Sequence, residues 1–250
     1  MSELTNKEFI DFLKSFDDKS FNNQKFYDTI TEISRKKSGK QESLIENDFS
    51  MYSLDDIAKG SPELSSNLPK TADALYYKED DEGNFSLYFI EFKFHNLDDP
   101  DAKDLLDNFI DEIYAFDKKF KCVSKYKQDL NKIKKYYGDD VTHTLILKPI
   151  ESIKVVIPKL YKEYCKQNKN CEEKDIEAFL DNIEKKLFVF VSTYTENGKF
   201  NRHKERLDSQ GTGLEKYFER LKSGKIIDYY EICPRSNFDV FLELEQLLMN

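Results

Sequence analysis

The sequence predicts an α/β protein with a central mixed sheet flanked by helices, and two segments carry most of that prediction. The stretch from Thr71 to His95 has the pattern of a β-hairpin, with two aromatic-containing runs on either side of a polar turn. Leu187 to Tyr194 is a largely apolar run, as expected for a central strand. Segments with apolar residues at helical spacing surround these strands, and no linker divides them. We therefore expect a single α/β domain over residues 1–250.

Helices are expected at the N-terminus. Apolar residues recur at i, i+3, i+4 and i+7 between Asn6 and Phe16, and a similar stripe runs from Asn22 to Arg35. A short helical piece around Glu42 to Glu46 and a weakly marked strand from Phe49 to Leu54 are expected next. Lys59 to Lys70 contains a glycine, two prolines and three serines, which predicts a loop.

The hairpin is the best-marked element of the chain. Asp73 stands at the head of the short strand Ala74 to Tyr77, and the turn Glu79 to Asn84 contains Gly83, which can adopt a positive φ. Phe85 to Phe94 is the second strand. Because side chains alternate along a strand, every second residue lies on the same face. One face therefore carries Phe85, Leu87, Phe89, Glu91, Lys93 and His95.

The rest of the chain alternates between expected helices and strands. A helix begins at Asp98-Asp99-Pro100-Asp101, where an Asp cap and an early proline are typical of a helix start, and it continues or resumes as far as Gly138. A strand is expected over Thr142 to Lys148. Helices are then expected over 151–164 (kinked at Pro158), 173–185, 214–221 and 238–248, and strands over 187–194 and 226–232, with a polar loop over 198–213.

Two acids and a lysine are expected to converge at one end of the hairpin. Glu91 and Lys93 lie on the same strand face, and Asp73 comes from the neighbouring strand. Charged groups at the end of an apolar strand face need partners. Two carboxylates and a lysine at one point could hold a hard cation and a phosphate. The alternative is a cross-strand ion pair of Glu91 and Lys93 where the strand leaves the core.

Asp73 followed by Glu91-Phe92-Lys93 resembles the active-site signature of the PD-(D/E)xK nuclease superfamily, which has the restriction-endonuclease-like fold. The family places the first Asp at the start of one hairpin strand and the E-x-K triplet on the next, and this chain has both in that order. The chain departs from the signature at its first position, because Ala72 precedes Asp73 where the signature has Pro. The resemblance covers roughly Ile30 to Lys148.

This resemblance implies a core with the order helix–strand–strand–strand–helix–strand. The nuclease-like core is then roughly residues 21–148, with N-terminal helices before the sheet, and residues 149–250 form a C-terminal α/β extension of it. The strand expected over Thr142 to Lys148 completes that order.

The resemblance also implies the chemistry. Mg²⁺ or Mn²⁺ is expected to bind Asp73, Glu91 and the backbone carbonyl of Phe92, while Lys93 acts on water or on the phosphate. The resemblance thus implies that the protein is a divalent-metal-dependent nuclease that hydrolyses phosphodiester bonds, with DNA favoured over RNA as substrate. In the family a helix before the hairpin often adds another acid, for which the candidates are Glu32, Glu42 and Glu46.

Basic residues in the loop 198–213 are the candidates for binding nucleic acid, with His95 as a further one; the loop residues are Lys199, Arg202, Lys204 and Arg206. Arginine binds phosphate in a bidentate manner, and four of the five arginines lie in the last fifth of the chain. The alternative function is a non-catalytic member of the same fold that binds a protein partner. The sequence also leaves open whether the protein forms a homodimer.

Composition excludes several other classes. The formal net charge of −9 argues against indiscriminate coating of DNA. No run of 18 apolar residues and no signal-peptide pattern occur, so we expect a cytoplasmic protein without membrane contact. The four cysteines lack C-x-x-C spacing and are expected to be reduced thiols, and three histidines make a zinc site a poor fit.

Overall fold

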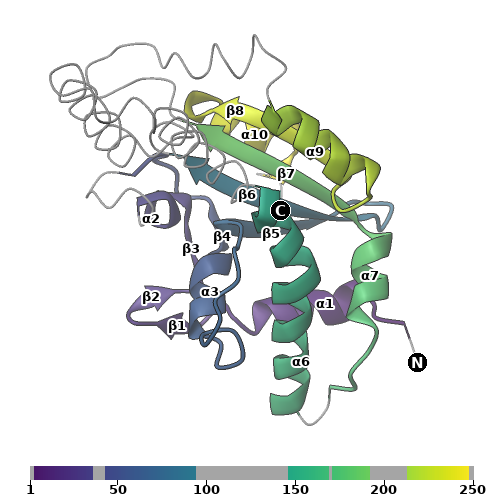
Figure 1. Cartoon of the computed structure of the whole chain (residues 1–250). Helices are drawn as coiled ribbons and strands as arrows, with labels where there is room; N and C mark the ends of the chain where they lie inside the picture. Colours follow the sequence, from purple (N-terminus) through teal and green to yellow (C-terminus); the bar gives the residue numbers. More distant parts are fainter. Residues whose placement is uncertain (1–2, 36–42, 94–145, 169–170, 192–212, 248–250) are drawn as a thin grey trace, which may run out of the picture.

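The computed structural model describes residues 3–35, 43–93, 146–168, 171–191 and 213–247, and these form an α/β structure around a mixed six-stranded sheet (Figure 1). The strands follow one another across the sheet in chain order: β3 (Tyr27–Thr29), β4 (Ser50–Tyr52), β5 (Ala74–Glu79), β6 (Phe85–Lys93), β7 (Glu184–Val191) and β8 (Tyr229–Pro234). The first four strands pair antiparallel, whereas β6, β7 and β8 run parallel to one another. The expected mixed sheet with flanking helices is confirmed.

Two apolar cores cover the two faces of this sheet. The larger one contains Leu87 and Phe89 of β6 and is closed by helices α1 (Asn6–Lys14), α3 (Leu54–Gly60), α6 (Ile157–Gln167), α7 (Ile176–Asn182) and α9 (Gly213–Ser223). The smaller one contains Tyr88 and Ile90 and is closed by helices α2 (Ile30–Arg35) and α10 (Phe238–Leu244). Alternate residues of β6 therefore enter opposite cores, as strand geometry requires. Figure 1 views the sheet from the side of α6 and α9.

The hairpin forms as the sequence predicts. β5 and β6 pair from Ala74 opposite Ile90 to Glu79 opposite Phe85. Gly83 in the connecting turn has φ 83°, a conformation that glycine adopts without a steric penalty. Phe85, Leu87 and Phe89 all lie in the larger core, which confirms the expected face for these residues.

The N-terminal third differs from the prediction in three places. The helix expected over Asn22 to Arg35 exists only as α2; before it lie β3 and the two-residue strands β1 (Ser20–Phe21) and β2 (Gln24–Lys25). Asn22 and Asn23 have positive φ, which asparagine tolerates and a helix does not allow. The second difference is α3, which begins at the last residue of the predicted strand and ends at the second residue of the predicted loop. The third is the short helical piece expected around Glu42 to Glu46, because residues 43–46 are not helical.

The strand expected over Thr142 to Lys148 is wrong for residues 146–148. Residues 142–145 lie outside the described part of the chain, and residues 146–151 are helical. The reason is that the isoleucines at 146, 150, 153 and 157 all pack on the larger core, at the spacing of one helix face. β7 is the next described strand beside β6. The helix is also disturbed next to Pro158, as expected, by the π-helical turn Ser152–Val156.

The later elements follow the prediction with shifted ends. β7 begins at Glu184, earlier than expected, and β8 covers Tyr229–Pro234. α7, α9 and α10 all lie where amphipathic stripes predict helices. The prediction of reduced cysteines is wrong for Cys165 and Cys171, which form a disulfide because the segment after α6 brings their Cα atoms to 4.8 Å. Cys233 is a free, buried thiol.

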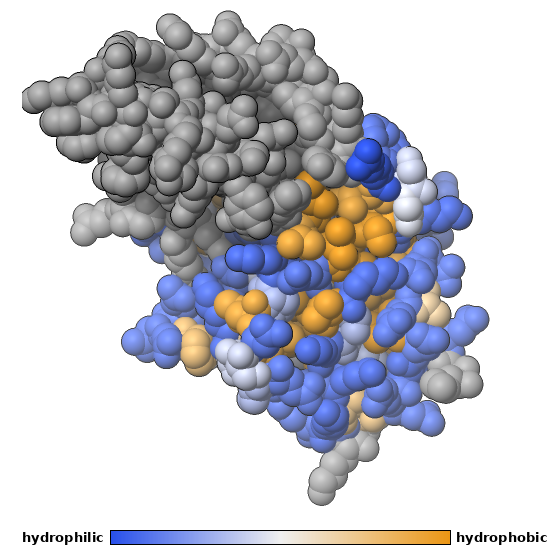
Figure 2. All heavy atoms as spheres, in the orientation of Figure 1, coloured by the Kyte–Doolittle hydropathy of each residue, from blue (hydrophilic) through white to orange (hydrophobic). Residues whose placement is uncertain are grey.

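The surface shown in Figure 2 is mainly hydrophilic over the described residues, with apolar residues gathered beside α6. A search of the described helices found none with the length and apolar character needed to cross a membrane.

Candidate active site

Asp73 and Glu91 are neighbours across the β5–β6 hairpin. The register that pairs Ala74 with Ile90 continues to Asp73 opposite Glu91. Both side chains are almost fully buried, at 1% and 2% exposure. One carboxylate oxygen of Asp73, Oδ2, accepts a hydrogen bond of 2.8 Å from the backbone N–H of Phe92. The structure therefore brings the two predicted carboxylates together, and Asp73 is fixed by the strand that carries Glu91.

A lysine that the sequence did not single out lies between these carboxylates. The Nζ atom of Lys148 is 2.6 Å from Oε1 of Glu91 and 3.1 Å from Oδ1 of Asp73. The Lys148 side chain is 14% exposed, so all three charged groups lie below the surface. Removing two carboxylates from water is unfavourable unless a cation accompanies them. One ammonium group serves both carboxylates.

The helix that carries Lys148 is attached to the strand that carries Asp73. Ser152 is fully buried, and its Oγ accepts a 2.9 Å hydrogen bond from the N–H of Ala72. A carboxylate oxygen of Glu151 accepts a hydrogen bond from the N–H of Lys70. Because residues three and four apart lie on one helix face, Lys148, Glu151 and Ser152 meet the same segment. These contacts set the position of Lys148 relative to Asp73.

A second helix, α3, also holds this segment. The hydroxyl of Thr71, two residues before Asp73, hydrogen-bonds to the carboxylate of Asp55 in α3. Asp55 also pairs with Lys59 at 3.4 Å, and its neighbour Asp56 accepts a hydrogen bond of 2.6 Å from Ser53. Through Thr71, Asp55 holds the chain that leads into β5. Sequence reasoning missed these two acids because it assigned no element to residues 55–58, between the expected strand and the expected loop.

The other predicted site residues fall into two groups. Lys93 is the last residue of β6, and only its backbone is described, so the position of its ammonium group stays a prediction. The Phe92 side chain enters the smaller core, and its carbonyl as a metal ligand also stays a prediction. The remaining predicted contacts to nucleic acid lie outside the described residues: His95, Lys199, Arg202, Lys204 and Arg206.

Of the candidate N-terminal acids that the structure describes, neither Glu32 nor Glu46 is bonded to Asp73 or Glu91. Glu32 pairs with Arg35 on α2 at 2.6 Å, with both side chains largely exposed. Glu46 is exposed, and Glu42 lies outside the described residues. Among the residues that the structure describes, no group of three or more His, Cys, Asp or Glu side chains could hold a metal ion. The site offers two carboxylates.

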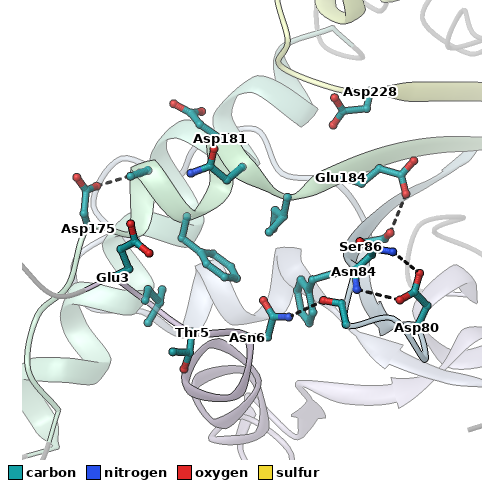
Figure 3. Close-up of a pocket in the computed structure, with 17 residues that line it drawn as sticks. Glu3, Thr5, Asn6, Asp80, Asn84, Ser86, Asp175, Asp181, Glu184 and Asp228 are labelled. Carbon is teal, nitrogen blue, oxygen red and sulfur yellow. Dashed lines mark hydrogen bonds between the residues drawn. The ribbon is translucent and has the colours of Figure 1, made fainter.

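A large acidic cavity lies at the opposite end of β6 (Figure 3). Its volume is about 1220 Å³, and its lining among the described residues contains no lysine or arginine but several carboxylates: Glu3, Asp80, Asp175, Asp181, Glu184 and Asp228. Several of these have local partners. Asp175 caps α7 through the N–H of Ala178, and Glu184 accepts a hydrogen bond from Ser86. Such a surface repels phosphate, so it is a poor place for nucleic acid.

The position of Lys148 could not have been read from local spacing, since 57 residues separate it from Glu91. The one available signal was the isoleucine stripe that begins at residue 146, which places Lys148 near the start of a helix. Comparisons of this chain with protein-family models, with curated proteins and with solved structures find no match.

Proposed function

We propose that this protein is a divalent-metal-dependent nuclease with the restriction-endonuclease-like fold, in which Asp73 and Glu91 hold Mg²⁺ or Mn²⁺. The observation that carries the proposal is the buried pair of carboxylates at neighbouring positions of two strands, both bonded to one cationic group. Buried carboxylates that share a cation are typical of functional sites as well as of structural ion pairs. Their place in the hairpin favours the functional reading, because it matches the PD-(D/E)xK signature.

The order of elements supports the same proposal. β4, β5 and β6 form an antiparallel meander, a long helix follows from residue 146, and β7 then returns parallel to β6. With α2 as the first helix, and with α3 and α7 as additional helices, this order agrees with the helix–strand–strand–strand–helix–strand order that the resemblance implies. In this version of the proposal β7 replaces residues 142–148 as the fourth core strand. The core then extends beyond residue 148.

The residues present fit a magnesium or manganese ion. Magnesium in proteins is usually held by one or two carboxylates, with water and substrate phosphate completing its coordination. The ammonium of Lys148 serves as a stand-in, since it shows that one cation can contact Glu91 and Asp73 together. A bound metal ion would polarise the scissile phosphate and make a bound water more acidic.

The chain's own residues would prepare the site for that chemistry. The N–H of Phe92 orients Asp73, and burial of both carboxylates keeps competing water away from them. Lys148, and Lys93 by resemblance, provide positive charge for a phosphate that is about to gain negative charge. DNA is the favoured substrate, and Arg202 and Arg206 with their neighbouring lysines are the proposed backbone contacts.

The test is a cleavage assay with labelled single-stranded and double-stranded DNA and RNA, in Mg²⁺ or Mn²⁺ and in EDTA. Wild type should cleave at least one substrate only with metal. Asp73→Asn and Glu91→Gln should abolish cleavage, and Glu184→Gln, a carboxylate at the other end of the sheet, should not change it. Metal-dependent cleavage that survives both site substitutions would overturn the proposal. So would a folded wild type that cleaves none of the substrates.

A further inference from the structure

We propose that Lys148 and the divalent cation occupy the same position in turn, so that Lys148 holds the metal-free site together and moves aside when the metal binds. This inference rests on the proposed metal-binding function and concerns how the site is loaded. It assigns to Lys148 a role that the E-x-K signature does not contain.

The first step of the argument is competition for the same oxygen atoms. Nζ of Lys148 lies 2.6 Å from Oε1 of Glu91 and 3.1 Å from Oδ1 of Asp73. A magnesium ion needs oxygen ligands at about 2.0–2.1 Å. A metal ion that bound both of these oxygens would stand in the space that Nζ now fills. The two cations therefore exclude each other, by contact and by charge.

The second step is the charge of the pocket. Two adjacent buried carboxylates repel each other, and one ammonium group neutralises only half of their charge. A divalent cation neutralises both. The stronger attraction of a doubly charged cation to both carboxylates favours exchange of Lys148 for Mg²⁺ or Mn²⁺.

The third step is that the exchange needs no movement of the backbone. The side chains of Ser152 and Glu151 attach the helix to the segment before Asp73 by accepting hydrogen bonds from its backbone N–H groups, and these bonds do not involve Lys148. The lysine side chain is a flexible four-carbon stem, and here it is 14% exposed, so it has a path toward solvent. After the exchange the ammonium group stays within a side-chain length of the carboxylates. It is then available to a phosphate bound at the same metal.

The main experiment measures Mn²⁺ binding by calorimetry to wild type, Lys148→Met and the control Lys154→Met. Lys154 lies on the same helix, in an ion pair with Asp181 at 2.5 Å that is exposed to solvent. Removing a competing cation should tighten Mn²⁺ binding by about tenfold or more in Lys148→Met. The control should keep the wild-type dissociation constant within about twofold.

A second measurement keeps the proposal testable if Lys148→Met does not fold. Wild type is treated with a limiting amount of an amine-acylating reagent, with and without saturating Mg²⁺, and labelling is read by mass spectrometry. Labelling of Lys148 should rise several-fold with Mg²⁺, while labelling of Lys154 stays constant. This readout does not depend on cleavage.

The outcomes separate this inference from the proposed function. If wild type binds Mn²⁺ and Lys148→Met binds it equally or more weakly, or if Mg²⁺ leaves Lys148 labelling unchanged, the exchange is refuted and the nuclease proposal stands on its own cleavage assay. If wild type and variant both bind no metal, the exchange and the metal site fall together. If the exchange is observed but wild type cleaves nothing, the nuclease proposal alone is wrong.

Discussion

The two ends of β6 both gather carboxylates, yet they differ in what surrounds them. At the Glu91 end, two acids are buried and share the ammonium of Lys148. At the other end, the acids of the cavity in Figure 3 meet solvent. Those with partners cap helix α7, bond to the hairpin, or pair with a lysine, as Asp181 does with Lys154 and Asp228 with Lys185. Phe85 and Glu91 are six positions apart along β6, a distance of about 20 Å.

The comparison teaches that the number of acids is a weak signal for a cation site. In a chain with 48 acidic residues, clusters of carboxylates are frequent, and most are solvated. A buried carboxylate is a stronger signal, because its negative charge must be balanced by a cation or by hydrogen-bond donors next to it. The pair at the Glu91 end is therefore expected to control stability and metal binding, whereas the cavity acids are expected to control neither.

Lys148→Met should produce the largest loss of stability. It leaves two adjacent buried carboxylates without the ammonium group they share, so the free energy of unfolding should fall by about 3–5 kcal/mol. Urea denaturation in EDTA measures this. The matched control, Lys154→Met, removes an exposed ion pair and should cost about 1 kcal/mol or less. Equal losses for the two variants would mean that burial of the pair has no special effect.

Glu91→Gln and Lys148→Met should not be additive. Once Lys148 is replaced, removing the charge of Glu91 also removes its repulsion with Asp73, so the second substitution should be much less harmful than it is in wild type. The coupling free energy should be about 1–3 kcal/mol. A double-mutant cycle by urea denaturation in EDTA gives the value. Additive losses would show that Lys148 and Glu91 do not act as a pair.

Ser152→Ala should destabilise the protein by an intermediate amount. It removes the acceptor of the buried Ala72 N–H, which should cost about 1–3 kcal/mol. Ser65→Ala is the control, because its hydroxyl bonds to Pro62 at an exposed site. Thermal unfolding distinguishes the two. If Ser152→Ala is as stable as the control, the helix does not depend on this contact for its position.

Glu8 gives a small, pH-dependent contrast near the acidic end. Its pKa is lowered to about 2 from 4.5, mainly by its hydrogen bond to Lys174, then by the backbone of Thr5. A lowered folded-state pKa stabilises the protein above pH 4.5, and this contribution disappears as the pH falls toward 2. Glu8→Gln should therefore lose a little stability at pH 7 and none at pH 2. A loss that is the same at both pH values would contradict this, and solvent screening keeps it small.

Glu184→Gln should have the smallest effect of all. Glu184 lies at the start of β7 beside the acidic cavity and is exposed, so unfolding free energy should change by about 0.5 kcal/mol at most. Mn²⁺ affinity by calorimetry should be unchanged. A loss of metal binding in this variant would place the cation site at the cavity end of β6 and contradict its assignment to Asp73 and Glu91.

The local part of the site could be predicted from the sequence because a hairpin is a local structure. A polar turn with Gly83 sets the register of β5 and β6, and the register alone places Asp73 opposite Glu91. The fold class could be predicted from the hairpin pattern and from the apolar run Leu187 to Tyr194, which contains the second half of β7. These inferences need only neighbouring residues.

The remaining part depends on contacts between distant segments. The sequence of residues 142–148 alternates as in a strand. The helix is indicated only by the isoleucines at helical spacing that begin at residue 146 and continue beyond residue 148. Lys148 reaches Glu91 because that helix is bound to the chain before Asp73, and no local pattern encodes this. The Asn22–Asn23 turn was a readable signal, because both residues tolerate positive φ, but the apolar spacing of 22–35 outweighed it.

The central claim is that Asp73 and Glu91 form the cation site of this protein. The most direct measurement is an anomalous difference map from a crystal of wild type grown with Mn²⁺. The account predicts one strong peak between the carboxylates of Asp73 and Glu91, with the Lys148 ammonium displaced from its position against them. A peak at the cavity acids instead, or Lys148 still bonded to both carboxylates with no peak beside them at saturating Mn²⁺, would contradict it.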